Sequence, residues 1–303
     1  MMFGYCLSVL LLVVVVNSAI LGKDDPLLGI AQEYAGKSCG HIYDNNFASR
    51  NKSGLYWVKL ITNEIVQVHC EMGLSVGSSK TVAWTKIADV DGYSCPSGWE
   101  AATIPRSAKR VCKGNGEIAG CYSAHFRIRG QNFNEVYGKV LGYQKGRTTA
   151  FNAYYSKKHD IDDTYVDGVS ITYDYPRQHL FTYASGYSAG TTYRYTSYNC
   201  PCSSYAGQTP PAFVRDDYYC EAGCTGAPSA TTYYSDNMLW DGKDCPVGNS
   251  CCAQPEMPYF YRRLPIATNG TVEAIEVRIC QDTSFATAAT LVSEMQIFIG
   301  SDL

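Results

Sequence analysis

The chain has 303 residues, of which 17 % are charged and 46 % hydrophobic, and this balance is typical of a folded protein rather than a disordered one. That length suffices for one large domain or two smaller ones. The net charge of −3 gives no electrostatic reason to expect nucleic acid or an anionic membrane as a partner, and it is far too small for an acidic polyelectrolyte that coats mineral.

A mostly apolar run at the N-terminus, residues 7–16, predicts export from the cell. Ten residues suit the core of a signal peptide, whereas a bilayer span needs about 20. Small residues follow the run, so we expect cleavage near Ser18 or Ala19, with Gly22 as another candidate, although no Lys or Arg precedes it. With residues 1–19 removed, no later run is apolar enough to span a membrane. The mature chain is therefore expected to be secreted and extracellular.

The cysteines agree with export. The chain has 14 of them, and Cys6 would leave with the signal peptide, so the mature chain keeps 13. In an oxidising compartment these are expected to form disulfides, and the odd number leaves at least one free or paired with another chain in a disulfide-linked oligomer. The thirteen are Cys39, Cys70, Cys95, Cys112, Cys121, Cys200, Cys202, Cys220, Cys224, Cys245, Cys251, Cys252 and Cys280.

Two acceptor sequences for N-linked glycans also fit export. They are Asn51-Lys52-Ser53 and Asn269-Gly270-Thr271. In a secreted chain they predict surface glycans on both asparagines.

The N-terminal part of the mature chain predicts a short leading segment and then a hairpin. Residues 20–38 form that segment, and 24–34 are compatible with a brief helix without requiring one. From residue 39 onward the sequence is strand-like. Two β-prone runs and the turn between them lie at residues 55–58, 65–70 and 62–64.

The rest of the chain also favours strands. Residues 183–235 are rich in Tyr, Ser, Thr, Gly and Pro, which predicts short strands and ordered loops held by cysteines. Three other runs alternate apolar and polar residues, so each should turn one face inward and one outward. These runs are 126–129, 169–173 and 275–279. We therefore predict a mainly β, disulfide-rich fold, with α+β as the alternative.

The first part of the mature chain resembles the opening of a fibrinogen-like C-terminal domain. The resemblance covers about residues 38–88 and implies a small β subdomain over 39–90 with a Cys39–Cys70 disulfide. The later hallmarks of that family are missing, so neither its calcium loop nor its ligand pocket is carried over. The segments that carry the resemblance are Cys39-Gly40-His41-Ile42-Tyr43-Asp44, Ser53-Gly54, Leu55-Tyr56-Trp57-Val58, Val68-His69-Cys70-Glu71-Met72 and Trp84-Thr85-Lys86-Ile87.

The remainder, residues 91–303, is predicted to be a larger cysteine-rich β unit. Together with the truncated fibrinogen-like start it is similar to uncharacterised skeletal organic matrix proteins of stony corals. The segments behind this similarity include Cys95-Pro96-Ser97-Gly98-Trp99, Tyr165-Val166-Asp167-Gly168, Cys200-Pro201-Cys202, Leu239-Trp240-Asp241-Gly242 and Cys251-Cys252. The resemblance implies a place, the secreted or skeletal matrix, more than an activity.

Metal-binding patterns are weak. Cys200-Pro201-Cys202 with Cys220 and Cys224 has some likeness to a zinc knuckle, but export favours disulfides and no His stands at ligand spacing. Four aspartates offer oxygen ligands that suit Ca²⁺, although their spacing is not that of an EF-hand loop and an acidic turn is the favoured alternative. They are Asp160, Asp162, Asp163 and Asp167. No cofactor is expected beyond this weak calcium candidate.

No catalytic motif stands out, so we expect no enzyme. None of the five histidines has the spacing of a metalloprotease helix, and no nucleophile elbow or phosphate-binding glycine loop occurs. The most polar cluster beside a strand is Pro176-Arg177-Gln178-His179, which is either a site or, as the favoured alternative, an exposed loop.

These patterns predict a secreted structural protein of the extracellular matrix. The coral-matrix resemblance implies that this matrix is the organic matrix of a calcified skeleton. The alternative is a fibrinogen-like, lectin-type recognition protein that binds glycans or acetylated ligands. The expected partners are accordingly matrix components or glycans.

Overall fold

The computed structural model divides the chain into two compact units, with the boundary between Thr85 and Lys86. This boundary lies inside strand β3 (Ala83–Val90), and the boundary predicted at residue 90 is the last residue of the same strand. The structure describes residues 24–104, 108–116, 120–145, 161, 168–188, 197–198, 212–214, 217–222, 259–281 and 289–301.

The first unit is built on an antiparallel hairpin, with a short helix and two single-turn helices beside it in the chain. Its two strands coincide with the predicted runs at 55–58 and 65–70, which are thereby confirmed. The elements are η1 (Gln32–Tyr34), α2 (Cys39–Asn45), η2 (Phe47–Ser49), β1 (Gly54–Lys59) and β2 (Ile65–Met72).

Helix α2 corrects the prediction that the chain is strand-like from residue 39 onward. The side-chain oxygen of Ser38 accepts a hydrogen bond from the backbone N–H of His41 at 3.0 Å, which caps the first turn. The helix buries Cys39 and Ile42 in the core of the unit. Ser38 is the sequence signal from which this helix could have been predicted.

A buried amide fastens the leading segment of the first unit. The Nδ2 of Asn46 donates to the carbonyl oxygens of Pro26 and Leu28, and its Oδ1 accepts from the backbone N–H of Ser49. Because Asn46 is fully buried, each of these bonds replaces one to water. Residues 24–30 are therefore an ordered part of this unit.

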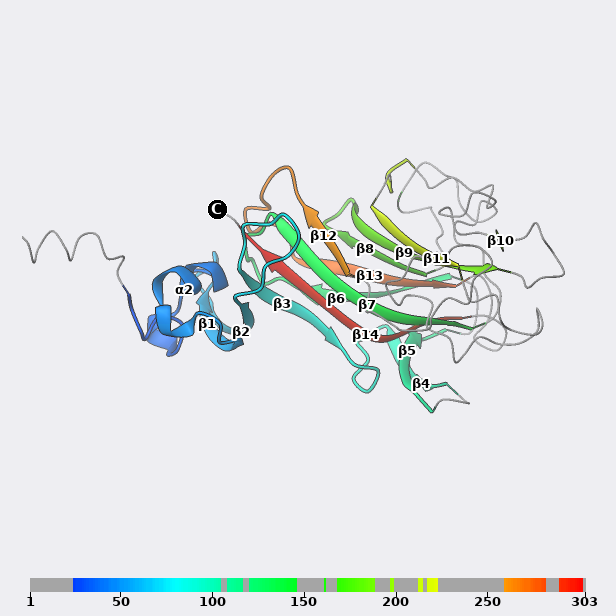
Figure 1. Cartoon of the computed structure of the whole chain (residues 1–303), viewed down its shortest axis with the longest axis horizontal. Helices are drawn as coiled ribbons and strands as arrows, with labels where there is room; N and C mark the ends of the chain where they lie inside the picture. The colour runs from blue at the N-terminus through cyan, green and yellow to red at the C-terminus, as the bar shows by residue number, and fades with distance from the viewer. Residues whose placement is uncertain are drawn as a thin grey trace, which may run out of the picture. The chain divides into compact units, whose positions relative to one another are not determined.

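The second unit is a sandwich of two sheets, which Figure 1 shows as separate layers. In sheet A, β14 lies between β7 on one side and β3 and β5 on the other; β12 extends beyond β7 and β4 beyond β5. Besides β3, its strands within the second unit are β4 (Trp99–Thr103), β5 (Arg110–Gly114), β7 (Glu135–Lys145), β12 (Tyr259–Arg263) and β14 (Ala289–Gly300).

Sheet B has the order β10-β9-β8-β13-β6, and β11 pairs in parallel with β9. Its other pairings are antiparallel. Its strands are β6 (Gly120–Arg127), β8 (Gly168–Tyr173), β9 (Gln178–Ser188), β10 (Ser197–Tyr198), β11 (Tyr218–Ala222) and β13 (Ala274–Gln281).

One apolar core lies between the two sheets. Alternate residues of β13, Ile275, Val277 and Ile279, meet Met295 and Ile297 of β14 in the same cluster. The core also holds aromatic rings: Phe181 stacks on Phe260 with centroids 4.8 Å apart. Burial of this interior is the main favourable contribution to the fold.

The alternating runs at 169–173 and 275–279 do form strands, but the prediction of one exposed face is wrong for both. In β8 and β13 nearly every residue is buried, on both faces. Glu276 and Arg278, which should point to solvent, are only 7 % and 5 % exposed. The reason is that Glu276 pairs with Arg177 and Ser123, while Arg278 donates to the backbone carbonyl of Ile161.

Three disulfides among the described residues complete a mainly β, disulfide-rich fold, as predicted. They join Cys39 to Cys70 in the first unit, and Cys95 to Cys112 and Cys121 to Cys280 in the second. The first of these is the pair that the fibrinogen-like resemblance implies. Within the described ranges, no helix is long and apolar enough to cross a membrane.

Candidate functional site

The outer face of sheet B carries a cluster of buried polar side chains around one carboxylate. In the strand register, Glu276 of β13 stands opposite Thr172 of β8, and Arg278 stands opposite Ser123 of β6. Directly paired residues project to the same face of a sheet, so all four lie on the side away from the apolar core. We call these four residues and Arg177 the Glu276 cluster.

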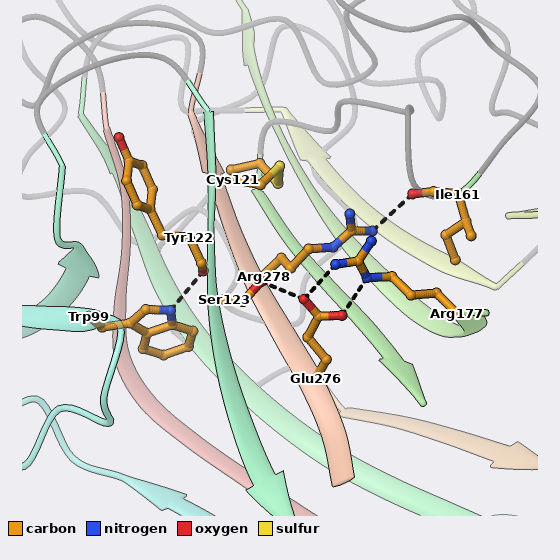
Figure 2. The surroundings of a disulfide bond; sticks show 9 residues. Trp99, Cys121, Tyr122, Ser123, Ile161, Arg177, Glu276 and Arg278 are labelled. Carbon is orange, nitrogen blue, oxygen red and sulfur yellow. Dashed lines mark hydrogen bonds and ion pairs between the residues drawn. A yellow bond between two sulfur atoms is a disulfide. The ribbon is translucent and has the colours of Figure 1, made fainter. Parts of the chain in front are cut away.

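Arg177 binds Glu276 with two hydrogen bonds. It lies in the turn between β8 and β9, and its Nε and Nη2 donate to the two carboxylate oxygens, the second at 3.0 Å. Such a paired contact between guanidinium and carboxylate fixes orientation as well as charge. Ser123 also donates its hydroxyl to the carboxylate, so the side chains of three separate segments meet at Glu276 (Figure 2).

The carboxylate is held in its ionised form. Burial alone raises the pKa of Glu276, but the hydrogen bonds from Arg177 and Ser123 and the charges of Arg177 and Arg278 outweigh it, so the pKa lies below its ordinary value. At the rim, the Nε2 of the exposed His125 lies 4.0 Å from the same carboxylate. The cluster therefore carries buried charges of both signs in contact.

Arg278 extends the cluster toward the loop before β8. Its Nη2 donates to the backbone carbonyl of Ile161 at 3.2 Å. Ile161 is flanked in sequence by the predicted calcium ligands Asp160, Asp162, Asp163 and Asp167, all of which lie outside the described residues. Among the residues with described side chains, no three His, Cys, Asp or Glu are close enough together to hold a metal ion.

A bulge brings a histidine to the same face. The pairing of β8 with β9 shifts between Ile171 and Thr172, which leaves Leu180 as an extra residue and sets His179 and Thr182 on one side. The Nε2 of His179 lies 2.8 Å from the hydroxyl of Thr182. The ring of Phe213 meets the His179 ring edge-on, with centroids 5.7 Å apart.

His179 is neutral at ordinary pH. Burial is the largest cause, and the positive charges of Arg262 and Arg278 add to it, so that together they lower the pKa of His179 to about 3. Arg262 of β12 forms an ion pair with Asp217, and the carbonyl of Asp217 accepts from the backbone N–H of Thr182 at 3.2 Å. Two arginines, Arg262 and Arg278, thus act on an uncharged imidazole on this side of the molecule.

The structure shows how much of the run Pro176-Arg177-Gln178-His179 is exposed. The favoured prediction, an exposed loop, is wrong for Arg177 and His179, whose side chains reach the polar face of sheet B. Pro176 and Gln178 are exposed, as a loop requires. Sequence reasoning missed Glu276 and Arg278 as members of this cluster, because an alternating strand predicts solvent on their side.

The hydrogen bonds of the Glu276 cluster link neighbouring strands of sheet B to one another. The Ser123 hydroxyl donates to a carboxylate that two arginines neutralise, and this restrains the hydroxyl rather than activating it as a nucleophile. Breaking one partner of such a buried pair leaves an uncompensated charge.

The other predicted positions are the two glycosylation sites, the leader and the remaining cysteines. Asn51 and Asn269 are exposed and adopt left-handed backbone conformations, with φ of 62° and 52°. The backbone of Cys220 belongs to β11. The leader and the remaining cysteines, which are Cys200, Cys202, Cys224, Cys245, Cys251 and Cys252, lie outside the described residues.

Comparison with known proteins adds no relative. No protein-family model, no curated protein and no solved structure matches this chain. The fibrinogen-like and coral-matrix resemblances therefore remain predictions.

Proposed function

We propose that the protein is a secreted structural component of an extracellular matrix, and specifically of the organic matrix of a calcified skeleton. The observation that carries the proposal is the disulfide framework, with one bridge in the first unit and two in the second. Disulfides form and persist in oxidising compartments, and the apolar run at residues 7–16 would direct the chain there.

The bridges also suit a protein that must persist outside the cell. Their partners are separated by 31, 17 and 159 residues. A disulfide that closes loops of this size stabilises the folded state by about 3–5 kcal/mol, because it restricts the unfolded chain. Such bridges favour a durable matrix component.

Glycans on Asn51 and Asn269 are part of the proposal. Both side chains are exposed, as a glycan requires. When the full chain is expressed in animal cells, we expect it in the medium without its leader and with a glycosidase-sensitive mass. The double variant Asn51→Gln with Asn269→Gln should lack that mass difference. Retention inside the cell, with reduced cysteines, would contradict export.

The matrix role needs a separate experiment. Antibodies against the protein should detect it in the organic residue that is released when cleaned skeletal mineral is dissolved. A freely soluble body-fluid protein of matched size serves as the control for contamination. Finding the chain only in the fluid would rule out the matrix role and leave export intact.

One observation favours the recognition alternative. Six large apolar side chains are exposed in the first unit alone, where most of them lie before or within the hairpin. Exposed apolar side chains that form one contiguous patch mark a binding surface. They are Leu27, Ile30, Tyr34, Phe47, Leu55 and Ile61. A glycan array with and without calcium tests a lectin-type role, and binding to none of its glycans would remove it.

A further inference from the structure

The disulfide between Cys121 and Cys280 differs from the other two in its exposure. Cys121 is exposed, whereas Cys280 is only 1 % exposed. Both cysteines of the Cys39–Cys70 bridge are buried. In the Cys95–Cys112 bridge, Cys112 is buried and Cys95 is half-buried. Attack on a disulfide needs access to one of its sulfurs, so Cys121 offers the most open point of entry.

The position of Cys121 in the sheet also makes it accessible to an attacking thiolate. Cys121 lies on β6, which pairs only with β13 among the described strands and so forms an edge of sheet B. Cys280 stands directly opposite it in the register. A reagent that reaches Cys121 from this edge meets a bridge whose far sulfur belongs to a buried central strand.

The far sulfur shares its face of the sheet with a cation. Arg278 precedes Cys280 by two residues on β13, so its side chain projects to the same face as the disulfide. Figure 2 shows the disulfide, Arg278 and Glu276 on one side of the β6–β13 pair, with Tyr122 on the other. A nearby guanidinium stabilises a thiolate, so Cys280 is suited to be the leaving group.

We propose that the Cys121–Cys280 disulfide is a thiol-exchange site. A thiolate forms a new sulfur–sulfur bond with Cys121, the bond between Cys121 and Cys280 breaks, and Cys280 leaves as a thiolate beside Arg278. One disulfide is exchanged for another, so no oxidant or reductant is required. This inference goes beyond the matrix role and does not depend on it.

The attacking thiolate has two sources of the same chemistry, a small thiol or a cysteine of another copy of this chain. With the leader removed the chain has 13 cysteines, and because 13 is odd at least one of them is not in an intrachain disulfide. Among the described residues, six are paired in three disulfides. The cysteine left over in each chain is the candidate that would attack Cys121 of another copy.

The first test identifies the sulfur that is attacked. Free thiols of the folded, full-length protein are blocked with N-ethylmaleimide, glutathione is added, and released thiols are trapped with iodoacetamide before peptide mapping. We expect glutathione on Cys121 and the trap on Cys280, at a rate at least about tenfold above trapping at Cys95 or Cys112. Equal rates at the three bridges, or first release at Cys95–Cys112, would overturn the proposal.

The second test examines the leaving group. Arg278→Gln should slow release of Cys280 about fivefold, whereas Arg278→Lys keeps the charge and should retain most of the rate. Arg177→Gln is the matched control, because it disturbs the Glu276 cluster without removing the cation two residues from Cys280. An equal rate in Arg278→Gln and Arg278→Lys would overturn the role of Arg278.

The unblocked protein distinguishes the two sources. A disulfide-linked dimer whose bridge contains Cys121 identifies a cysteine of another copy, and this dimer should be absent from Cys121→Ser with Cys280→Ser. A monomer that accepts only glutathione identifies a small thiol. Dimers that persist in the double variant would overturn Cys121 as the point of attachment between copies.

Discussion

The hairpin of the first unit and the central strands of sheet B are both built from short β-prone runs, but their surroundings differ. In β1, Tyr56 and Val58 are buried while Leu55 and Lys59 are exposed, so the strand has a wet face and a dry face. In β13, every residue after Ala274 is buried, including Glu276 and Arg278. Alternation thus predicts which residues share a face, but it does not predict whether that face meets water.

The difference in surroundings changes what each outward residue contributes. Lys59 keeps its hydration on the hairpin, so it needs no partner. On sheet B, the loss of water from Glu276 is offset by Arg177, Ser123 and Arg278. The first unit therefore depends on its apolar core and its disulfide, and sheet B depends also on matched charges.

The largest effect is expected from removing the bridge of the first unit. Cys39→Ser with Cys70→Ser opens a loop with a sequence separation of 31 residues and should cost about 4 kcal/mol. Both cysteines lie in the core of the first unit, so hydrogen exchange should accelerate in β1 and β2 and stay slow in β13. Cys95→Ser with Cys112→Ser is the matched control and should affect the second unit instead. Equal loss of protection in both units would show that this contrast is wrong.

Neutralising the buried carboxylate should have the next largest effect. Glu276→Gln leaves Arg177 and Arg278 without their shared anion and should lower the free energy of unfolding by about 3 kcal/mol in denaturant titrations. Asp89→Asn is the control, since Asp89 is exposed and its pair with half-buried Lys86 should matter by less than about 1 kcal/mol. Similar losses in the two variants would mean that burial does not set the cost.

The same contrast shows how much of the molecule could be predicted from the sequence. The hairpin, the strands at 169–173 and 275–279 and the disulfide-rich β class follow from local patterns of β-prone residues and cysteines. The Glu276 cluster does not, because Ser123 and Glu276 are far apart in the chain and meet only through strand pairing. Only the polar run at 176–179 indicated that a group of polar side chains lies beside β8.

Acid should weaken sheet B. The pKa of His179 is lowered to about 3 in the folded protein, against about 6.5 in the unfolded chain. Between these pH values the unfolded chain binds a proton that the folded protein does not, so stability falls as the pH falls below about 6.5. At pH 5 the loss should be about 2 kcal/mol. Glu276, whose pKa is also lowered, adds to the loss only at still lower pH.

The measurement is thermal or denaturant unfolding at a series of pH values. In His179→Gln the slope between pH 6.5 and 5 should be much shallower than in the wild type, while the Asp89→Asn control keeps the full slope. An unchanged slope in His179→Gln would assign the acid sensitivity to another group.

The smallest effect is expected on the wet face of the hairpin. Leu55 is 64 % exposed, so Leu55→Thr removes little buried apolar surface and places a β-branched residue in a strand, where such residues are favoured. The free energy of unfolding should change by no more than about 0.5 kcal/mol. Val58→Thr on the dry face of the same strand is the control and should cost about 2 kcal/mol, because it buries a hydroxyl in the apolar core. A large loss of stability in Leu55→Thr would mean that this face of the hairpin is covered in solution. The outward faces of β1 and β13 would then both be buried, and the contrast between the two regions would be wrong.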